Sequence, residues 1–327
     1  MGQVACSRCG CRESESLEVD CKAELRDAEA LTVREAQHTA LLRSLPWWRN
    51  AKAHLVQITR IQAHWRGYLV RRRLPSLRRE TTLHDTDRNQ TDEARPVYTF
   101  DSGATYLGEW QGKFRHGLGT QTWPDGAKYS GRWELNKASG FGQFWHVDGD
   151  LYQGNWEEDK ASGKGVYTHL NGAVYQGEWT KDLQHGFGVE SWMDGSRYEG
   201  FYRAGLKQGF GRYVWMDGSQ YVGQWGNNKI NGSGVYMWSD GRQYVGEWLN
   251  NNMHGRGKYT WKDGRSYEGE YKDDRKEGCG VYMWADGRVY RGQWKAGKQH
   301  GEGEYVRQDG VRKSGLWKEG KRIKWNN

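Results

Sequence analysis

Aromatic and glycine positions recur along most of the chain with a period of 23 residues. In each unit a Tyr is followed by Gly two residues later and by Trp or Tyr four residues later, so rings and glycine share one face of a strand. Two more glycines follow eleven and thirteen residues after the Tyr and open a second strand, as in Gly232 to Trp238. The pattern predicts one β-hairpin per unit. The nine leading tyrosines are Tyr106, Tyr129, Tyr152, Tyr175, Tyr198, Tyr221, Tyr244, Tyr267 and Tyr290.

The two connections of a unit differ in sequence. Asp-Gly closes every unit, with Asn171-Gly172 once, and predicts a two-residue type I′ turn before the next Tyr. The connection inside a unit, such as Leu249 to His254, is polar and is expected to be longer. One hairpin cannot bury its ring face alone, so nine stacked hairpins would bury a continuous aromatic stripe. Eighteen strands about 4.8 Å apart would form a ribbon roughly 85 Å long.

This Tyr-x-Gly-x-Trp…Gly-x-Gly…Asp-Gly pattern resembles the MORN repeat, with nine full units from 106 to 312 and half-units at both ends. The resemblance implies a mainly β fold, an elongated, single-layer, twisted antiparallel meander of hairpins, which here follows an α-helical N-terminal region. It also implies scaffolding, dimerisation, binding of partner segments and contact with lipid. The sequence departs from the pattern where His146, His169 and Arg307 replace the usual Trp before the closing turn.

The N-terminal third has helical periodicity instead. An apolar face runs from about 15 to 44, and Pro46 interrupts it. A second helix is expected from about Trp48 to Leu74, because Pro75 stops it. Arginines interleave with its apolar positions, which is typical of a basic amphipathic helix. The apolar positions of this second helix are Leu55, Ile58, Ile61, Trp65 and Leu69.

Within that helix, residues 61–71 read Ile-Gln-x-x-x-Arg-Gly-x-x-x-Arg and resemble the IQ motif, which we place at 57–74. The resemblance implies binding of calmodulin or a related EF-hand protein. The apolar side chains would enter the groove of a lobe, the glutamine would bond a loop backbone, and the arginines would meet the acidic rim. A solvated basic helix without a partner is the alternative. The residues assigned to calmodulin binding are Ile58, Ile61, Gln62, Trp65, Arg66, Gly67, Leu69 and Arg71.

The first residues suggest lipid attachment. Gly2 is placed for N-myristoylation, although Cys6 stands where Ser or Thr is preferred. Cys6, Cys9 and Cys11 would supply neighbouring palmitoylation sites, and a second chain is needed for stable attachment to a membrane surface. Two alternatives stay open: a zinc site that adds Cys21 to these three, and free thiols.

Four segments follow from these patterns. They are a Cys-rich tail (1–14), a helical region with the IQ motif (15–80), a polar linker (81–97) and the repeat array (98–327).

Charge is distributed unevenly along the chain. The formal net charge is +8, yet residues 37–79 hold ten Lys or Arg and no Asp or Glu. The remaining 39 basic and 41 acidic residues give a net charge of −2, so we expect no nucleic-acid partner. No apolar run is long enough to span a membrane, and no apolar signal segment begins the sequence, so secretion is not expected. Five Cys, four of them within the first 21 residues, do not resemble a disulfide framework, so we expect a reducing, cytoplasmic compartment.

No catalytic pattern appears, so we expect a non-enzyme without cofactor or metal. Four histidines each precede a Gly-x-Gly pair, and we expect them to lie in loops. They would be too far apart to bind one metal ion together. They are His116, His185, His254 and His300.

The expected function is that of a scaffold or adaptor that docks a cytoskeletal or axonemal protein and recruits calmodulin, with homodimerisation as a family expectation. The main alternative is a structural axonemal subunit, similar to a radial-spoke scaffold, without membrane anchoring. Phosphoinositide binding by loop lysines is a weaker third hypothesis. The MORN resemblance implies a setting in a cilium, flagellum or cell cortex. The loop lysines are Lys137, Lys160, Lys229 and Lys298.

Overall fold

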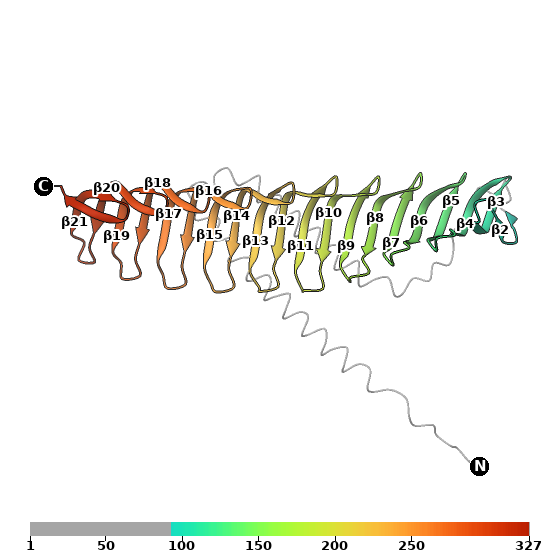
Figure 1. Ribbon diagram of the computed structural model, residues 1–327, viewed down its shortest axis with the longest axis horizontal. Coiled ribbons are helices and arrows are strands. Elements are labelled where there is room, and N and C mark those ends of the chain that lie inside the picture. Colours follow the sequence, from blue (N-terminus) through green and yellow to red (C-terminus); the bar gives the residue numbers. More distant parts are fainter. Residues whose placement is uncertain (1–92, 327) are drawn as a thin grey trace, which may run out of the picture. The chain divides into compact units, whose positions relative to one another are not determined.

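The computed structural model describes residues 93–326, which form one antiparallel sheet of 22 strands (Figure 1). These residues all belong to the second of the two units into which the chain divides, Glu80–Asn327. The predicted helices, the IQ residues and the acylation sites lie outside the described residues.

Strands β3 to β21 each pair with the next strand along the chain, and β1 and β2 both pair with β3. Figure 1 shows the strands of the array side by side in chain order, without crossovers. The predicted meander is therefore confirmed. The strands are β1 (Glu93–Ala94), β2 (Tyr98–Thr99), β3 (Thr105–Gln111), β4 (Phe114–Thr122), β5 (Lys128–Glu134), β6 (Lys137–Trp145), β7 (Leu151–Glu157), β8 (Lys160–Thr168), β9 (Val174–Thr180), β10 (Leu183–Ser191), β11 (Arg197–Arg203), β12 (Leu206–Val214), β13 (Gln220–Gly226), β14 (Lys229–Met237), β15 (Gln243–Leu249), β16 (Asn252–Thr260), β17 (Ser266–Lys272), β18 (Arg275–Met283), β19 (Val289–Lys295), β20 (Lys298–Val306), β21 (Arg312–Lys318) and β22 (Lys321–Trp325).

The nine full units supply β3 to β20, which gives the eighteen strands expected from the repeat. The sequence pattern indicated only half a unit at the C-terminal end of the array, but the structure has a complete hairpin there, β21–β22. The N-terminal half-unit contributes the two short segments β1 and β2 against the free side of β3.

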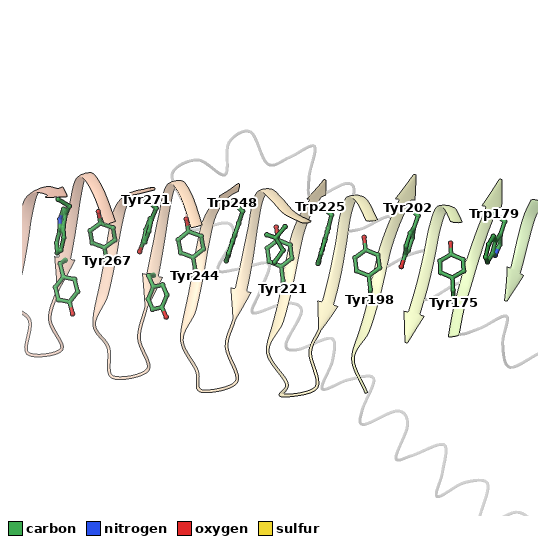
Figure 2. Close-up of a cluster of buried hydrophobic side chains, with 14 of the residues drawn as sticks. Tyr175, Trp179, Tyr198, Tyr202, Tyr221, Trp225, Tyr244, Trp248, Tyr267 and Tyr271 are labelled. Carbon is green, nitrogen blue, oxygen red and sulfur yellow. The ribbon is translucent and has the colours of Figure 1, made fainter. Parts of the chain in front are cut away.

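The core is a row of buried aromatic rings along one face of the sheet, with partly buried rings packed beside it. The nine leading tyrosines are at most 2% exposed. Each tyrosine ring makes an edge-to-face contact with one ring of its own unit and with one ring of the next unit. The ring centroid of Tyr221, for example, lies 5.5 Å from that of Trp225 and 5.7 Å from that of Trp248. Figure 2 shows these rings alternating along the row. Edge-to-face pairs stabilise beyond their buried area, so neighbouring units support one another through this row.

Each tyrosine hydroxyl also closes a bulge within its hairpin. The register of β13 and β14 shifts between Gly223 and Trp225, and the Tyr221 hydroxyl donates to the Gln224 carbonyl there, at 3.0 Å. The Ser233 amide donates to the Gln224 side chain at 2.8 Å. Backbone groups that the shifted ladder leaves unpaired are thus satisfied by side chains, as buried polar groups require.

The structure corrects both predicted connections. The one inside a unit is the two-residue type I′ turn: Leu249 pairs with Asn252, and the intervening Asn250 and Asn251 have φ of 51° and 74°. Asn251 also accepts the Ile230 amide at 2.8 Å, which ties this turn to the preceding hairpin.

The Asp-Gly connection is a longer loop rather than a type I′ turn. Gly126 donates its amide to the Trp123 carbonyl at 3.0 Å, and only Gly126, at φ 96°, has left-handed backbone. This is a turn followed by a left-handed glycine, the usual three-residue hairpin loop. Asp125 caps it by accepting the Ala127 amide at 3.0 Å.

Candidate functional site

The ring face carries one variable position per unit, nine residues after the leading tyrosine, on the second strand. Its side chain lies beside the rings, as Arg115 does 4.2 Å from the ring centre of Trp133. The chemistry at this position changes from unit to unit, which is where specificity can arise on an otherwise uniform surface. The ten residues are Arg115, Ala138, Ala161, Gln184, Lys207, Ile230, Met253, Lys276, Gln299 and Arg322.

Lys207 is a cation of this set that pairs with a carboxylate. Its Nζ donates to Glu190 Oε2 at 2.7 Å and lies 5.0 Å from the ring centres of Trp192 and Tyr198. The Tyr202 hydroxyl donates to the same carboxylate oxygen at 2.8 Å. Burial, and then the Glu190 carboxylate, raise the pKa of Tyr202 far above its ordinary value. One carboxylate thus binds two donors within an aromatic enclosure.

Lys276 lies three units further on and has four rings around its Nζ. The ring centres of Tyr282, Trp294, Tyr267 and Trp261 are 4.5, 4.9, 5.0 and 5.1 Å away. Burial, with a smaller effect of nearby Arg265, lowers the pKa of the Lys276 ammonium to about 8.

The outer face carries an apolar cluster across β10 to β12. Phe187 and Phe201 are directly paired, with ring centres 5.8 Å apart, and Phe210 on β12 is buried. These residues alternate with ring-face positions along their strands, so they lie on the opposite side of the sheet.

A row of exposed apolar side chains follows the Asp-Gly loops along one edge of the ribbon. Val147, Leu170, Met193 and Met216 occupy the same place in four consecutive units and are 63–78% exposed. Successive units are two strands apart, or about 10 Å. Contiguous exposed apolar rows are uncommon on soluble proteins and are typical of binding surfaces.

The sequence-predicted loop residues lie mostly in strands. The four histidines before Gly-x-Gly pairs are in β4, β10, β16 and β20, because the unit's short turn comes earlier than expected. The four loop lysines begin β6, β8, β14 and β20. His169, in place of the usual Trp, contacts Asp150 at 2.9 Å; the Leu170 amide, which donates to this carboxylate, contributes most to lowering the pKa of Asp150.

Within residues 93–326 no group of three or more His, Cys, Asp or Glu side chains is arranged to hold a metal ion. The same residues include no helix long and apolar enough to cross a bilayer. The assigned IQ residues, Gly2 and the three acylation cysteines lie outside the described part of the chain.

Three comparisons with known proteins bear on this chain. The MORN repeat family matches residues 106–128, 129–151, 152–174, 175–197, 198–220, 221–241, 244–264, 267–287 and 290–312. The IQ calmodulin-binding motif matches residues 57–75. Both families are interaction modules without catalytic activity. A comparison with curated proteins finds no match.

Solved structures give weak likenesses. The TCP10 domain of CPAP from Danio rerio is 11% identical, with a TM-score of 0.35, and the match covers 61% of this chain and 94% of that domain. The SAS-4 TCP domain of Drosophila melanogaster, solved with a proline-rich motif of Ana2, is 10% identical, with a TM-score of 0.30 and 58% and 92% coverage. These TM-scores are too low to carry an argument. The family assignment rests instead on the nine matched repeats, which cover more than half of the chain: the chain belongs to the MORN-repeat family.

Proposed function

We propose that the protein is a non-catalytic adaptor that docks a partner protein on its MORN ribbon and recruits calmodulin, or a related EF-hand protein, through the IQ segment. One observation carries the proposal: a single chain joins a nine-unit ribbon to an IQ calmodulin-binding motif at 57–75. The exposed apolar row from Val147 to Met216 supports docking, since such rows favour protein contacts.

Calmodulin binding is expected to be lost in the double variant Ile61→Ala with Gln62→Ala. The substitutions remove the apolar anchor and the paired amide of the motif. A calmodulin pull-down with the full chain, with and without calcium, measures the effect. Arg78→Ala and Arg79→Ala, outside the matched segment, form the control, because they lower the basic charge by two and should leave binding intact. Undiminished binding by the double variant contradicts the IQ assignment.

Membrane attachment is the finer part of the proposal, and it rests on Gly2 with the neighbouring cysteines Cys6, Cys9 and Cys11. Wild type is expected to carry myristoyl and palmitoyl groups and to float with membranes, whereas Gly2→Ala should carry no myristoyl group and remain in the supernatant. Intact mass and flotation of both proteins test this. If both are unmodified and stay with a detergent-resistant cytoskeleton, the alternative of a structural axonemal subunit replaces membrane anchoring.

A further inference from the structure

The sites around Lys207 and Lys276 are the same site in two different units, 69 residues or three repeats apart. The tyrosine four residues after the leading Tyr is Tyr202 in one and Tyr271 in the other. Two positions differ in kind: the carboxylate of Glu190 is replaced by Tyr259, and the hydroxyl of Ser196 by the guanidinium of Arg265. The second site therefore lacks a carboxylate and gains a cation.

In the second site both donors lack the acceptor that Glu190 provides in the first. The Lys276 ammonium makes ring contacts but no hydrogen bond or ion pair within residues 93–326. The Tyr271 hydroxyl is buried without a hydrogen-bond partner in the same part of the chain. Tyr259 supplies no negative charge and instead accepts a hydrogen bond from Arg242 at 3.2 Å. A buried donor without an acceptor is costly, so such a site favours a ligand that completes it.

The charged groups around Lys276 leave its charge uncompensated. Arg265, on the turn before β17, is the second cation of the site, and its own guanidinium pairs with Asp263 at 2.7 Å. Glu277 and Glu270 stand next to Lys276 and Tyr271 along their strands; Glu277 accepts the Ala296 amide and Glu270 accepts the Cys279 amide. Burial raises the pKa of the ring-face neighbour Tyr267, so its hydroxyl supplies no negative charge near neutral pH.

From this arrangement we propose that the ring face around Lys276 is a carboxylate-binding site, which takes a Glu or Asp side chain from an acidic segment of the docked partner. The Lys207–Glu190 pair shows the chemistry of the completed site. Lys276 is partly exposed, so a side chain arriving over the ring face can reach it. The site deepens the proposed docking function and rests on it.

The first test uses the full chain and a fluorescein-labelled peptide of eight glutamates, with a serine peptide of equal length as reference. Wild type is expected to bind the glutamate peptide, and Lys276→Met to weaken binding about tenfold or more, because methionine keeps the ring contacts without the charge. Lys207→Met is the matched control: it removes the same charge from a filled site and should leave affinity unchanged. Equal loss in both variants, or no binding by wild type, overturns the proposal.

A second variant tests the same site by adding the missing carboxylate instead of removing the lysine. Tyr259→Glu places the carboxylate where Glu190 stands and is expected to abolish binding of the glutamate peptide. Retained binding by a folded Tyr259→Glu protein counts against the proposal. Because all these variants keep the IQ segment, a failure of calmodulin recruitment and a failure of carboxylate binding are separate results.

The titration of Lys276 gives an independent readout. In protein whose lysines carry ¹³C-methyl groups, the Lys276 resonance is the one that disappears in Lys276→Met. Its pKa should lie near 8 in the free protein and rise when the glutamate peptide binds, since an opposite charge favours the ammonium. Peptide binding should accordingly weaken as pH rises through about 8. A pKa near the ordinary 10.5 without peptide means that the chain's own carboxylates already fill the site, and it overturns the proposal.

Discussion

Tyr221→Ala is expected to lower the free energy of unfolding by about 3–5 kcal/mol, the range for removing a buried aromatic side chain. Tyr221 is fully buried and meets Trp225 of its own unit and Trp248 of the next. The substitution leaves a cavity between two units and removes the hydrogen bond to the Gln224 carbonyl. Urea unfolding of the full chain, followed by tryptophan fluorescence, measures the loss.

Two control variants separate the contributions. Tyr221→Phe keeps the ring and removes only the hydroxyl, so about 0.5–1.5 kcal/mol should be lost. Tyr98→Ala removes a half-exposed ring beside β3 and should cost much less than Tyr221→Ala. If Tyr221→Ala costs no more than Tyr98→Ala, the ring row does not hold the units together.

The central position of Tyr221 adds a second expectation. Each unit contacts only its neighbours, so stability is a sum of unit and interface contributions. A defect at the sixth and seventh units weakens the coupling between the two parts of the array on either side of it. The unfolding transition of Tyr221→Ala should therefore broaden, and a sharp transition shifted as a whole would show coupling beyond nearest neighbours.

Much of this fold could be predicted because one physical pattern is repeated nine times. The alternation of Tyr106, Gly108 and Trp110 fixes which face is buried, and the absence of insertions fixes strand number and order. The structure confirms the meander, the eighteen strands of the full units and the aromatic stripe.

The sequence-based prediction assigned the two-residue type I′ turn to the Asp-Gly connection, whereas it lies inside each unit. Asp-Gly misleads here because it is a strong hairpin signal in both kinds of loop. What separates them is the number of left-handed residues. Asn250 and Asn251 are both left-handed in the two-residue turn, whereas the longer loop needs only Gly126. Paired Asn or Asp residues at the other connection, such as Asp273-Asp274, were the available signal, since these side chains tolerate positive φ.

The candidate site was missed for a different reason. Lys276 occupies a position that varies between units, so the repeat says nothing about it. Its environment comes from Trp261, Tyr267, Tyr282 and Trp294, which belong to three different units. The 23-residue period aligns Tyr259 with Glu190, but only the structure shows that the Glu190 carboxylate binds Lys207. The IQ segment, in contrast, could be predicted from the sequence, because the spacing of its residues along one short segment identifies the motif.

Gly211→Val is expected to destabilise the array strongly, by about 3 kcal/mol or more, for lack of space. A Cβ atom at Gly211 would lie 2.6 Å from Cε2 of the buried Tyr198. Overpacking a rigid core costs about 1–3 kcal/mol, and here the ring is held on both sides. Even Gly211→Ala should lower the unfolding midpoint in urea.

Gly209 gives the matched comparison, since its Cβ would meet only Phe201, at 3.7 Å, but its φ is +79°. Backbone conformation, rather than lack of space, therefore requires glycine at this position. Gly209→Val should therefore cost about 1–3 kcal/mol, whereas Gly209→Asn should cost far less, because asparagine tolerates this region. At Gly211 asparagine should be as harmful as valine. Equal tolerance of asparagine at both positions would contradict the distinction between a steric and a conformational requirement within one Gly-x-Gly pair.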